Sequence, residues 1–317
     1  MTIAAEAHAH RSRRRSSLAR RGLHASVPYL LILPAIVVIT AILGYPLYKL
    51  VSLSFQQYGL AELIQRKGAW IGLDNYSSVL HDEIFWRTLL RTAIFTVANV
   101  ALTIGLGTMI AFLLIRVSAW VRVMLTAGLV LAWSMPAVDA VQVWYWMTNF
   151  QNGILNYALT ELGIGDFSQH DWYATTFSKL AMVTLLIVWG AIPFVTITVY
   201  AGLAQVPREL VEAAEIDGAG PLRVFRDVTF PILKPIFLIL TSLSIIWDFG
   251  VFTQPYLLIG SSHVDSSNYL MGVYVFIEGY AHSDFGRGAA ISLLMLLMVA
   301  VMSVFYVRRM VKMGEAR

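Results

Sequence analysis

The sequence predicts an all-α membrane protein with six transmembrane helices and with both termini in the cytoplasm. Three observations lead to this prediction: the composition, the number of long apolar runs, and the placement of the basic residues. Of the 317 residues, 58% are hydrophobic and 13% are charged, whereas a soluble domain has about 25% charged residues. The mean hydropathy is +0.68, so most of this chain is suited to a bilayer rather than to water.

Six apolar runs are long enough to cross a bilayer, which takes about 20 helical residues. The predicted spans cover residues 28–50, 88–115, 123–147, 179–201, 235–255 and 288–307. Pro136 lies within the third run, and we expect it to kink that helix because proline lacks the backbone N–H. The segments expected outside the cell are 56–84, 148–178 and 256–287. The last of these is predicted to hold a short helix at 271–280.

Basic residues gather at the places that six spans would leave in the cytoplasm. They fill the first 26 residues, bracket the short turn after the second span at Arg116 and Arg122, and follow the last span at Arg308 and Arg309. Cytoplasmic loops carry an excess of Lys and Arg, which explains the tail without a nucleic-acid partner. The predicted domains are a flexible basic tail at 1–26, a six-span domain at 27–312 and a cytoplasmic end at 313–317.

The longest charged segment between two apolar runs lies at 203–234, which the span count places in the cytoplasm. Pro207 suits the first turn of a helix, and Gly218 suits its end. A second short helix is predicted from Pro221 to Pro231, so the segment should bend between the two. Apolar side chains on such a helical pair need a partner surface in the cytosol.

This segment resembles the EAA loop of ABC importer permeases. The resemblance rests on Glu212-Ala213-Ala214, on Gly218-Ala219, and on Phe225, Pro231 and Pro235. Weaker similarity to the maltose and glycerol-3-phosphate permease group covers nearly the whole chain after residue 28. It includes Tyr29 to Pro34, Gly72 to Tyr76 and Asp284 to Ala290. The resemblance implies the architecture of a type I ABC importer permease in a bacterial cytoplasmic membrane.

The resemblance also implies a set of partners. A second permease subunit would complete a heterodimer, two ATPase subunits would bind ATP and Mg²⁺, and an extracytoplasmic protein would deliver a sugar. In that family the loop docks on the ATPase, here through residues 207–231. The residues expected to make or support this contact are Glu212, Ala213, Ala214, Asp217, Gly218, Ala219 and Phe225.

Several kinds of chemistry are excluded or unsupported. A P-loop requires a glycine directly before its lysine, and none of the lysines, at 49, 67, 179, 234 and 312, follows one. The chain has no cysteine, and its seven histidines show no spacing typical of a metal site. We therefore expect a transport subunit rather than an enzyme, with no catalytic residue, no metal and no cofactor of its own.

Polar residues inside spans are costly and mark candidate sites. Asp248 lies in the middle of the predicted fifth span, and Asp139 lies in the third, where proximity to the outer surface is the alternative explanation. Hydrogen bonds between helices are the alternative for Asn99, Gln142 and Ser242. A carboxylate within a span must face a wet cavity or a partner, and a sugar suits it because neighbouring hydroxyls donate charge-assisted hydrogen bonds.

The resemblance adds a candidate sugar site on the two spans that flank the loop. The residues at the family's site positions are Trp189, Gly190 and Phe194 in the fourth span and Ser244, Trp247 and Asp248 in the fifth. The match in the fifth span needs a gap of one residue between Pro231 and Pro235. Simple packing is the alternative for Trp189 and Phe194.

These features favour a permease subunit of an ATP-driven carbohydrate importer. A neutral di- or oligosaccharide is expected because no Arg or Lys lies deep in the fourth or fifth span. The overall pattern is most similar to actinobacterial disaccharide permeases, trehalose permeases among them. A polyol or glycerol phosphate remains an alternative cargo. An ion-driven secondary transporter would require coupling carboxylates and inverted repeats, and a receptor or anchor would leave the loop unexplained.

Overall fold

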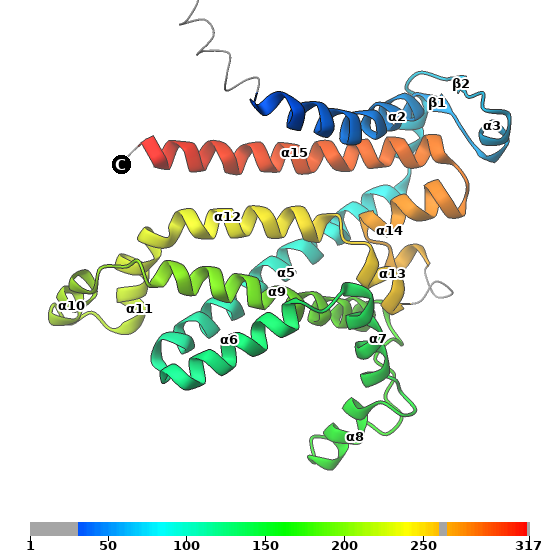
Figure 1. Ribbon diagram of the computed structural model, residues 1–317. Coiled ribbons are helices and arrows are strands. Elements are labelled where there is room, and N and C mark those ends of the chain that lie inside the picture. Colours follow the sequence, from blue (N-terminus) through cyan, green and yellow to red (C-terminus); the bar gives the residue numbers. More distant parts are fainter. Residues whose placement is uncertain (1–30, 260–264, 316–317) are drawn as a thin grey trace, which may run out of the picture.

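The computed structural model describes residues 31–259 and 265–315, and it shows a bundle of long helices (Figure 1). Five helices are long and apolar enough to cross a membrane. They are Leu31–Ser54, Glu83–Arg116, Thr176–Leu203, Pro221–Phe249 and Phe285–Met310. A bent pair of helices, Ala119–Trp133 and Ala137–Met147, makes a sixth span if the pair counts as one. The predicted all-α membrane fold is confirmed, with five or six spans, and this pair occupies the place of the predicted third span.

The third span is broken rather than kinked. Helices α6 (Ala119–Trp133) and α7 (Ala137–Met147) meet at an angle of 100°. Pro136 is the N-cap of α7, with an extended ψ of 143°. A residue that precedes proline is also driven away from helical geometry. The expectation of one bent helix over 123–147 is therefore corrected to two helices with a corner at Met135 and Pro136.

Two long helices form the centre of the bundle. Helix α5 (Glu83–Arg116) packs along α9 (Thr176–Leu203). Gly107 permits their close approach, because a Cβ atom built there would lie 2.7 Å from Cγ1 of Val195. Both helices start at capped ends: the Asp82 side chain accepts from the N–H of Ile84, and the Thr175 side chain accepts from the N–H of Ser178.

The fifth span differs from its predicted limits at both ends. The short helix α11 (Pro221–Val224) continues through a π-helical turn, η2 (Phe225–Thr229), directly into α12 (Phe230–Phe249). The predicted stop at Pro231 is wrong, because this proline follows the π-helical turn directly and the helical segment continues through it. The span also ends at Phe249 instead of residue 255, and a separate helix, α13, follows at Thr253–Ile259.

Helix α13 and the segments that carry α3 (Leu60–Gln65) and α14 (Met271–Phe276) lie at the end of the bundle opposite to α10 (Arg208–Ile216) and α11 (Figure 1). A minimal antiparallel hairpin pairs Gln56 with Trp70 and Gln57 with Ala69. The further elements are η1 (Thr40–Gly44), α2 (Tyr45–Ser54), β1 (Gln56–Gln57), α3 (Leu60–Gln65), β2 (Ala69–Trp70), α4 (Asp74–Leu80), α8 (Ile154–Glu161), η4 (Ser266–Asn268), α14 (Met271–Phe276), η5 (Ile277–Ala281) and α15 (Phe285–Glu315). The predicted short helix at 271–280 is confirmed by α14 and η5.

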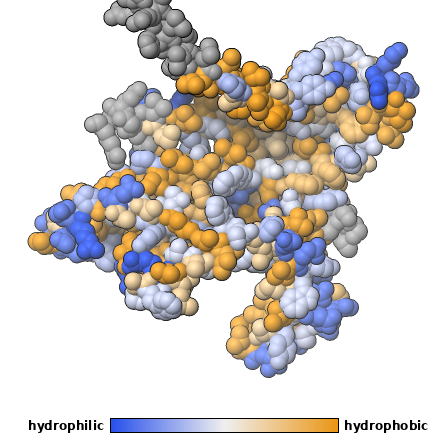
Figure 2. Space-filling model, in the orientation of Figure 1, coloured by the Kyte–Doolittle hydropathy of each residue, from blue (hydrophilic) through white to orange (hydrophobic). Residues whose placement is uncertain are grey.

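The surface agrees with a bilayer location. Figure 2 shows hydrophobic surface over much of the bundle and hydrophilic surface around the α10 and α11 tip and the β1–β2 hairpin. Many large apolar side chains on the long helices are exposed in the single chain, among them Val97, Met109 and Val301. The predicted tail at 1–26 lies outside the described residues, as do residues 316 and 317 of the predicted cytoplasmic end.

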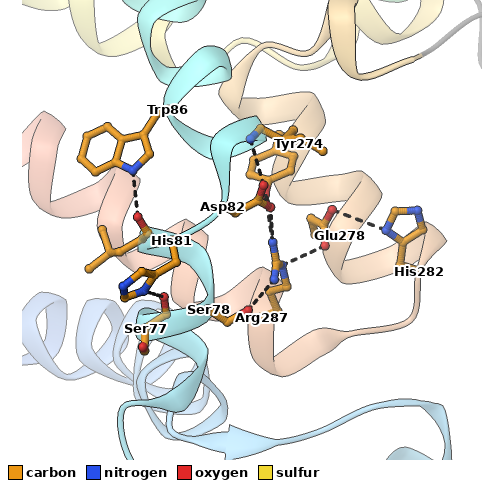
Figure 3. Close-up of polar contacts among 11 residues, drawn as sticks. Ser77, Ser78, His81, Asp82, Trp86, Tyr274, Glu278, His282 and Arg287 are labelled. Atoms are coloured by element: carbon orange, nitrogen blue, oxygen red, sulfur yellow. Dashed lines mark hydrogen bonds and ion pairs between the residues drawn. The ribbon is translucent and has the colours of Figure 1, made fainter.

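A polar cluster ties α4, α14, η5 and α15 to the start of α5 (Figure 3). The Arg287 side chain, at the start of α15, pairs with Asp82 before α5 and with Glu278 of η5, the latter at 3.0 Å. Arg287 also donates to the Ser78 hydroxyl at 2.6 Å, and the Tyr274 hydroxyl donates to Asp82 at 3.0 Å. Burial raises the pKa of Tyr274 to about 12, so its hydroxyl stays protonated and remains a donor.

Candidate functional site

A cavity of about 280 Å³ opens between the α6–α7 corner, α9 and the end of α12. Its volume lies near the lower end of the range of small-molecule sites, roughly 300–1,000 Å³. The lining is mostly apolar and aromatic. Because the chain turns at Pro136, residues of both α6 and α7 line the cavity. The lining residues are Ala132, Trp133, Met135, Ala137, Ala140, Leu186, Ile187, Trp189, Gly190, Ala191, Phe194, Trp247, Asp248, Val251 and Gln254.

Five of the six residues expected to bind sugar line this one cavity. They are Trp189, Gly190, Phe194, Trp247 and Asp248. Ser244, the sixth, is buried one helical turn before Asp248 and is not among the lining residues. The two flanking spans thus bring together residues that are far apart in the sequence, as the resemblance implied.

Asp248 lies at the end of its helix rather than in the middle of a span. It is the penultimate residue of α12, and the Gly250 N–H caps its carbonyl. The residue as a whole is only 7% exposed. Among residues 31–259 and 265–315, no hydrogen bond or ion pair to its carboxylate is found. A buried carboxylate of this kind is costly unless hydrogen-bond donors reach it, so the cavity is the place from which donors would come.

Three aromatic rings from three helices form one wall. Trp133 of α6 stacks on Phe194 of α9, with ring centroids 5.9 Å apart at 25°. Phe194 in turn meets Trp247 of α12 at 5.6 Å and 61°. The three rings therefore pack on one another and also line the cavity.

Sequence reasoning did not place Trp133 at this site, and it marked Gln254 only as a polar residue within the predicted fifth span. Trp133 ends an ordinary apolar run, and only the sharp corner after it turns its ring toward α9. Gln254 lies just beyond the true end of α12, on α13. For Trp133 the sequence signal is its closeness to Pro136, which shows that a helix is interrupted but not where the next helix points.

The other polar residues within spans do not join this site. Asn99 and Ser242 donate to carbonyl oxygens of their own helices, at Phe95 and Ile239. The expectation that they bond between helices is therefore not met. Gln142 is exposed on α7, and Asp139 is exposed in the first turn of the same helix.

The second candidate site is the loop at residues 203–234, at the far end of α9 and α12, which is called the coupling loop here for the role that the resemblance implies. Helix α10 ends at Ile216, and Gly218 adopts a left-handed φ of 79°. The N–H groups of Gly218 and Ala219 bond the carbonyls of Glu215 and Ala214 at 3.0 and 2.9 Å. The predicted bend is confirmed at this position, since glycine adopts such a backbone without steric cost.

The loop exposes both charged and apolar side chains. Ile216 is 86% exposed, and Leu222 and Leu210 are also on the surface. Of the residues expected to contact or support an ATPase, Glu212, Ala213, Asp217 and Gly218 are exposed, whereas Ala214, Ala219 and Phe225 are half-buried. The exposed set fits a docking surface, and the half-buried set fits internal support.

Packing connects the loop to the helices that reach the cavity. A Cβ atom on Gly202 would lie 2.5 Å from Cδ1 of Ile236, so the end of α9 presses against α12. Phe225 lies edge to face with Phe112 of α5 at 5.5 Å and contacts Phe230 of α12 at 6.0 Å. The loop region therefore packs directly against α5, α9 and α12, so a movement of the loop would act on all three helices.

Residues 103–311 match the family model described as binding-protein-dependent transport system inner membrane component. The diacetylchitobiose uptake system permease protein DasB of Streptomyces coelicolor is 42% identical over 291 residues, which cover 92% of this chain and 88% of the relative. The trehalose/maltose transport system permease protein MalF of Thermococcus litoralis is 30% identical, covering 90% and 93%. The sulfoquinovosyl glycerol transport system permease protein SmoG of Agrobacterium fabrum is also 30% identical, covering 88% of each chain.

The fold has a counterpart among solved structures. A chain of a bacterial ABC transporter that imports the acidic polysaccharide alginate matches with a TM-score of 0.76, covering 95% of this chain and 99% of that chain. The two sequences are 17% identical, so the match concerns the fold alone.

Proposed function

The chain belongs to the family of binding-protein-dependent transport system inner membrane components, and we propose that it forms half of the translocation path of an ATP-driven importer for neutral di- or oligosaccharides. It is a carbohydrate ABC importer permease in a bacterial cytoplasmic membrane, a transport subunit whose ATPase is a separate protein. The observation that carries the proposal is the meeting of Trp189, Phe194, Trp247 and Asp248 around one cavity.

The cavity suits a sugar. Aromatic faces pack against the C–H faces of a pyranose ring, and a carboxylate accepts hydrogen bonds from two neighbouring hydroxyls. The relatives include permeases named for diacetylchitobiose and for trehalose/maltose, which supports a disaccharide as cargo. Glycerol phosphate is disfavoured, since no Lys or Arg is among the described residues that line the cavity.

The coupling loop would carry the energy of ATP binding. In the proposed mechanism, α10 and α11 sit in a groove of a cytosolic ATPase through the exposed face that includes Glu212 and Ile216. Closure of two ATPase subunits moves the loop. Because α11, η2 and α12 form one continuous helical segment from Pro221 to Phe249, the motion would reach Trp247 and Asp248 along one helix. The central cavity then changes from outward to inward access.

The rest of the proposed complex follows from the family. A second, related permease would pack against this chain and complete the translocation path. An extracytoplasmic binding protein would deliver the sugar to the end of the bundle that carries α8 and α14. The alginate transporter whose chain shares this fold has also been solved in complex with a periplasmic protein that holds an alginate pentasaccharide.

Reconstitution tests the proposal. The complex, purified with its partner subunits and placed in proteoliposomes with ATP and Mg²⁺ on the ATPase side, is expected to take up labelled diacetylchitobiose, trehalose or maltose only when the binding protein is present. Uptake that requires an ion gradient and ignores ATP would contradict it.

A further inference from the structure

The cavity contains a single ionisable side chain among its lining residues, that of Asp248. The residue is 7% exposed, and no side chain of the described parts of the chain donates a hydrogen bond to its carboxylate. The lining includes no Lys, Arg or His that would balance its charge. Since buried charges are usually paired, this carboxylate lacks the partner that a purely structural role would require.

The aromatic wall strengthens the same electrostatic preference. The Phe194 ring lies between Trp133 and Trp247, with ring centroids 5.9 Å from the former and 5.6 Å from the latter. The face of an aromatic ring carries partial negative charge and attracts cations and polarised hydrogens. A carboxylate beside such faces makes a cavity that attracts hydrogen-bond donors and repels anions.

We propose that Asp248 is a specificity-determining residue that sorts saccharides by charge. It accepts hydrogen bonds from a sugar that presents hydroxyl, amide N–H or ammonium groups, and it excludes sugars that place a carboxylate, sulfonate or phosphate in the cavity. The inference rests on the proposed function, because it assumes that the cavity holds the transported sugar. It adds the prediction that a positively charged amino sugar is accepted.

The amide of Gln254 completes the polar part of the lining. An amide both donates and accepts, so it serves neutral sugars and does not discriminate by charge. Discrimination therefore depends on Asp248, and Asp248→Asn is the informative variant because it keeps the size of the side chain and removes the charge. Ser242→Ala is a matched control, since Ser242 lies on the same helix, bonds its own Ile239 carbonyl and does not line the cavity.

The test measures binding to the purified complex without the external binding protein, so that only the permease selects. Three disaccharides that differ at one substituent serve as probes: an N-acetylated one, its free amine and a uronic acid. Titrations use calorimetry or the fluorescence of the cavity tryptophans, at about pH 8, which is above the ordinary titration range of aspartate.

The wild-type complex and Ser242→Ala are expected to bind the acetylated and amine sugars at least about tenfold more tightly than the uronic acid, equivalent to about 1.4 kcal/mol. Asp248→Asn is expected to reduce that ratio to near one and to weaken the amine most. Equal affinity of the wild type for the anionic and neutral sugars would overturn the charge filter alone, as would an unchanged ratio in Asp248→Asn. Failure of the wild type to bind any of the three sugars would overturn the charge filter, and it would overturn the proposed function as well only if the reconstituted complex also took up no diacetylchitobiose, trehalose or maltose with ATP.

Discussion

Phe112 of α5 and Phe225 of the coupling loop lie edge to face, with ring centroids 5.5 Å apart and an angle of 81° between their planes. Phe225 opens the π-helical turn that leads into α12, and its ring also contacts Phe230. The loop is therefore anchored to a helix outside the pair that it connects in sequence. This contact suggests that α5 moves with the loop, in addition to α9 and α12.

Phe225→Ala should uncouple ATP hydrolysis from transport. An aromatic pair contributes about 0.5–1.5 kcal/mol beyond the area it buries, and its loss lets the loop move without moving α5. We expect sugar uptake by proteoliposomes to fall severalfold while binding-protein-stimulated ATP hydrolysis continues. Phe305→Ala is the control, because Phe305 is exposed on α15 and far from the loop in sequence. A parallel fall in uptake and hydrolysis would argue against a coupling role.

Gly218→Val should abolish uptake and leave the protein in the membrane. Gly218 has a φ of 79°, and a β-branched side chain is strongly disfavoured there. The strain is purely backbone strain, since a Cβ atom at this position would meet nothing within 4 Å. Uptake assays and membrane immunoblots measure the two effects.

Gly220→Val is the matched control for that experiment. Gly220 lies in the same bend and also has open space around it, but its φ of −69° suits any residue. We expect it to retain most uptake, and Gly218→Asn to retain more than Gly218→Val, because asparagine tolerates the left-handed region. Equal loss in Gly218→Val and Gly220→Val would show that bulk, not conformation, matters here.

Arg287→Ala should lower the thermal stability of the purified protein. The side chain is only 19% exposed and pairs with Asp82 and Glu278, whose side chains are 19% and 14% exposed. Removing the cation leaves two neighbouring carboxylates without their partner, at a cost of about 2 kcal/mol or more. Arg87→Ala removes an exposed pair with Glu83 and should change the melting temperature little. Equal melting temperatures for the two variants would contradict this view of the cluster.

Gly107→Ala should destabilise the contact between α5 and α9. The added methyl group would lie 2.7 Å from Val195 Cγ1 and 3.3 Å from the Thr196 nitrogen, and overpacking of this kind costs about 1–3 kcal/mol. Gly105 lies two residues earlier in α5 and is exposed. A methyl group added there meets nothing within 4 Å, so Gly105→Ala should be neutral or stabilising. Thermal unfolding in detergent distinguishes the two variants. A Gly107→Ala protein as stable as Gly105→Ala would show that the two helices separate at little cost.

The loop was predictable from the sequence because its signals are local. Pro207, Gly218 and Pro221 each act on the backbone of their own turn, and the structure bends where they predict. The end of α12 was missed for a different reason. The apolar run continues past Gly250 to Pro255, so hydropathy does not report the helix end, although a glycine at a helix end is a recognisable signal.

The cavity could be predicted only in part. Trp189, Phe194, Trp247 and Asp248 were identified by resemblance, and the structure brings them together. Trp133 could not be identified, because its position depends on the 100° corner after α6. Proline shows where a helix breaks, but packing against α9 decides the angle. The two-residue strands at Gln56–Gln57 and Ala69–Trp70 are likewise too short to produce an alternating pattern.

The central claim is that the coupling loop lies in the cytosol, where a separate ATPase moves it. Since the chain has no cysteine, Glu215→Cys on the exposed face of α10 provides a unique site for a membrane-impermeant maleimide. The account predicts labelling in inside-out vesicles, protection when the ATPase subunits are bound, and no labelling in intact cells. Labelling of Glu215→Cys from the outside of intact cells would contradict it.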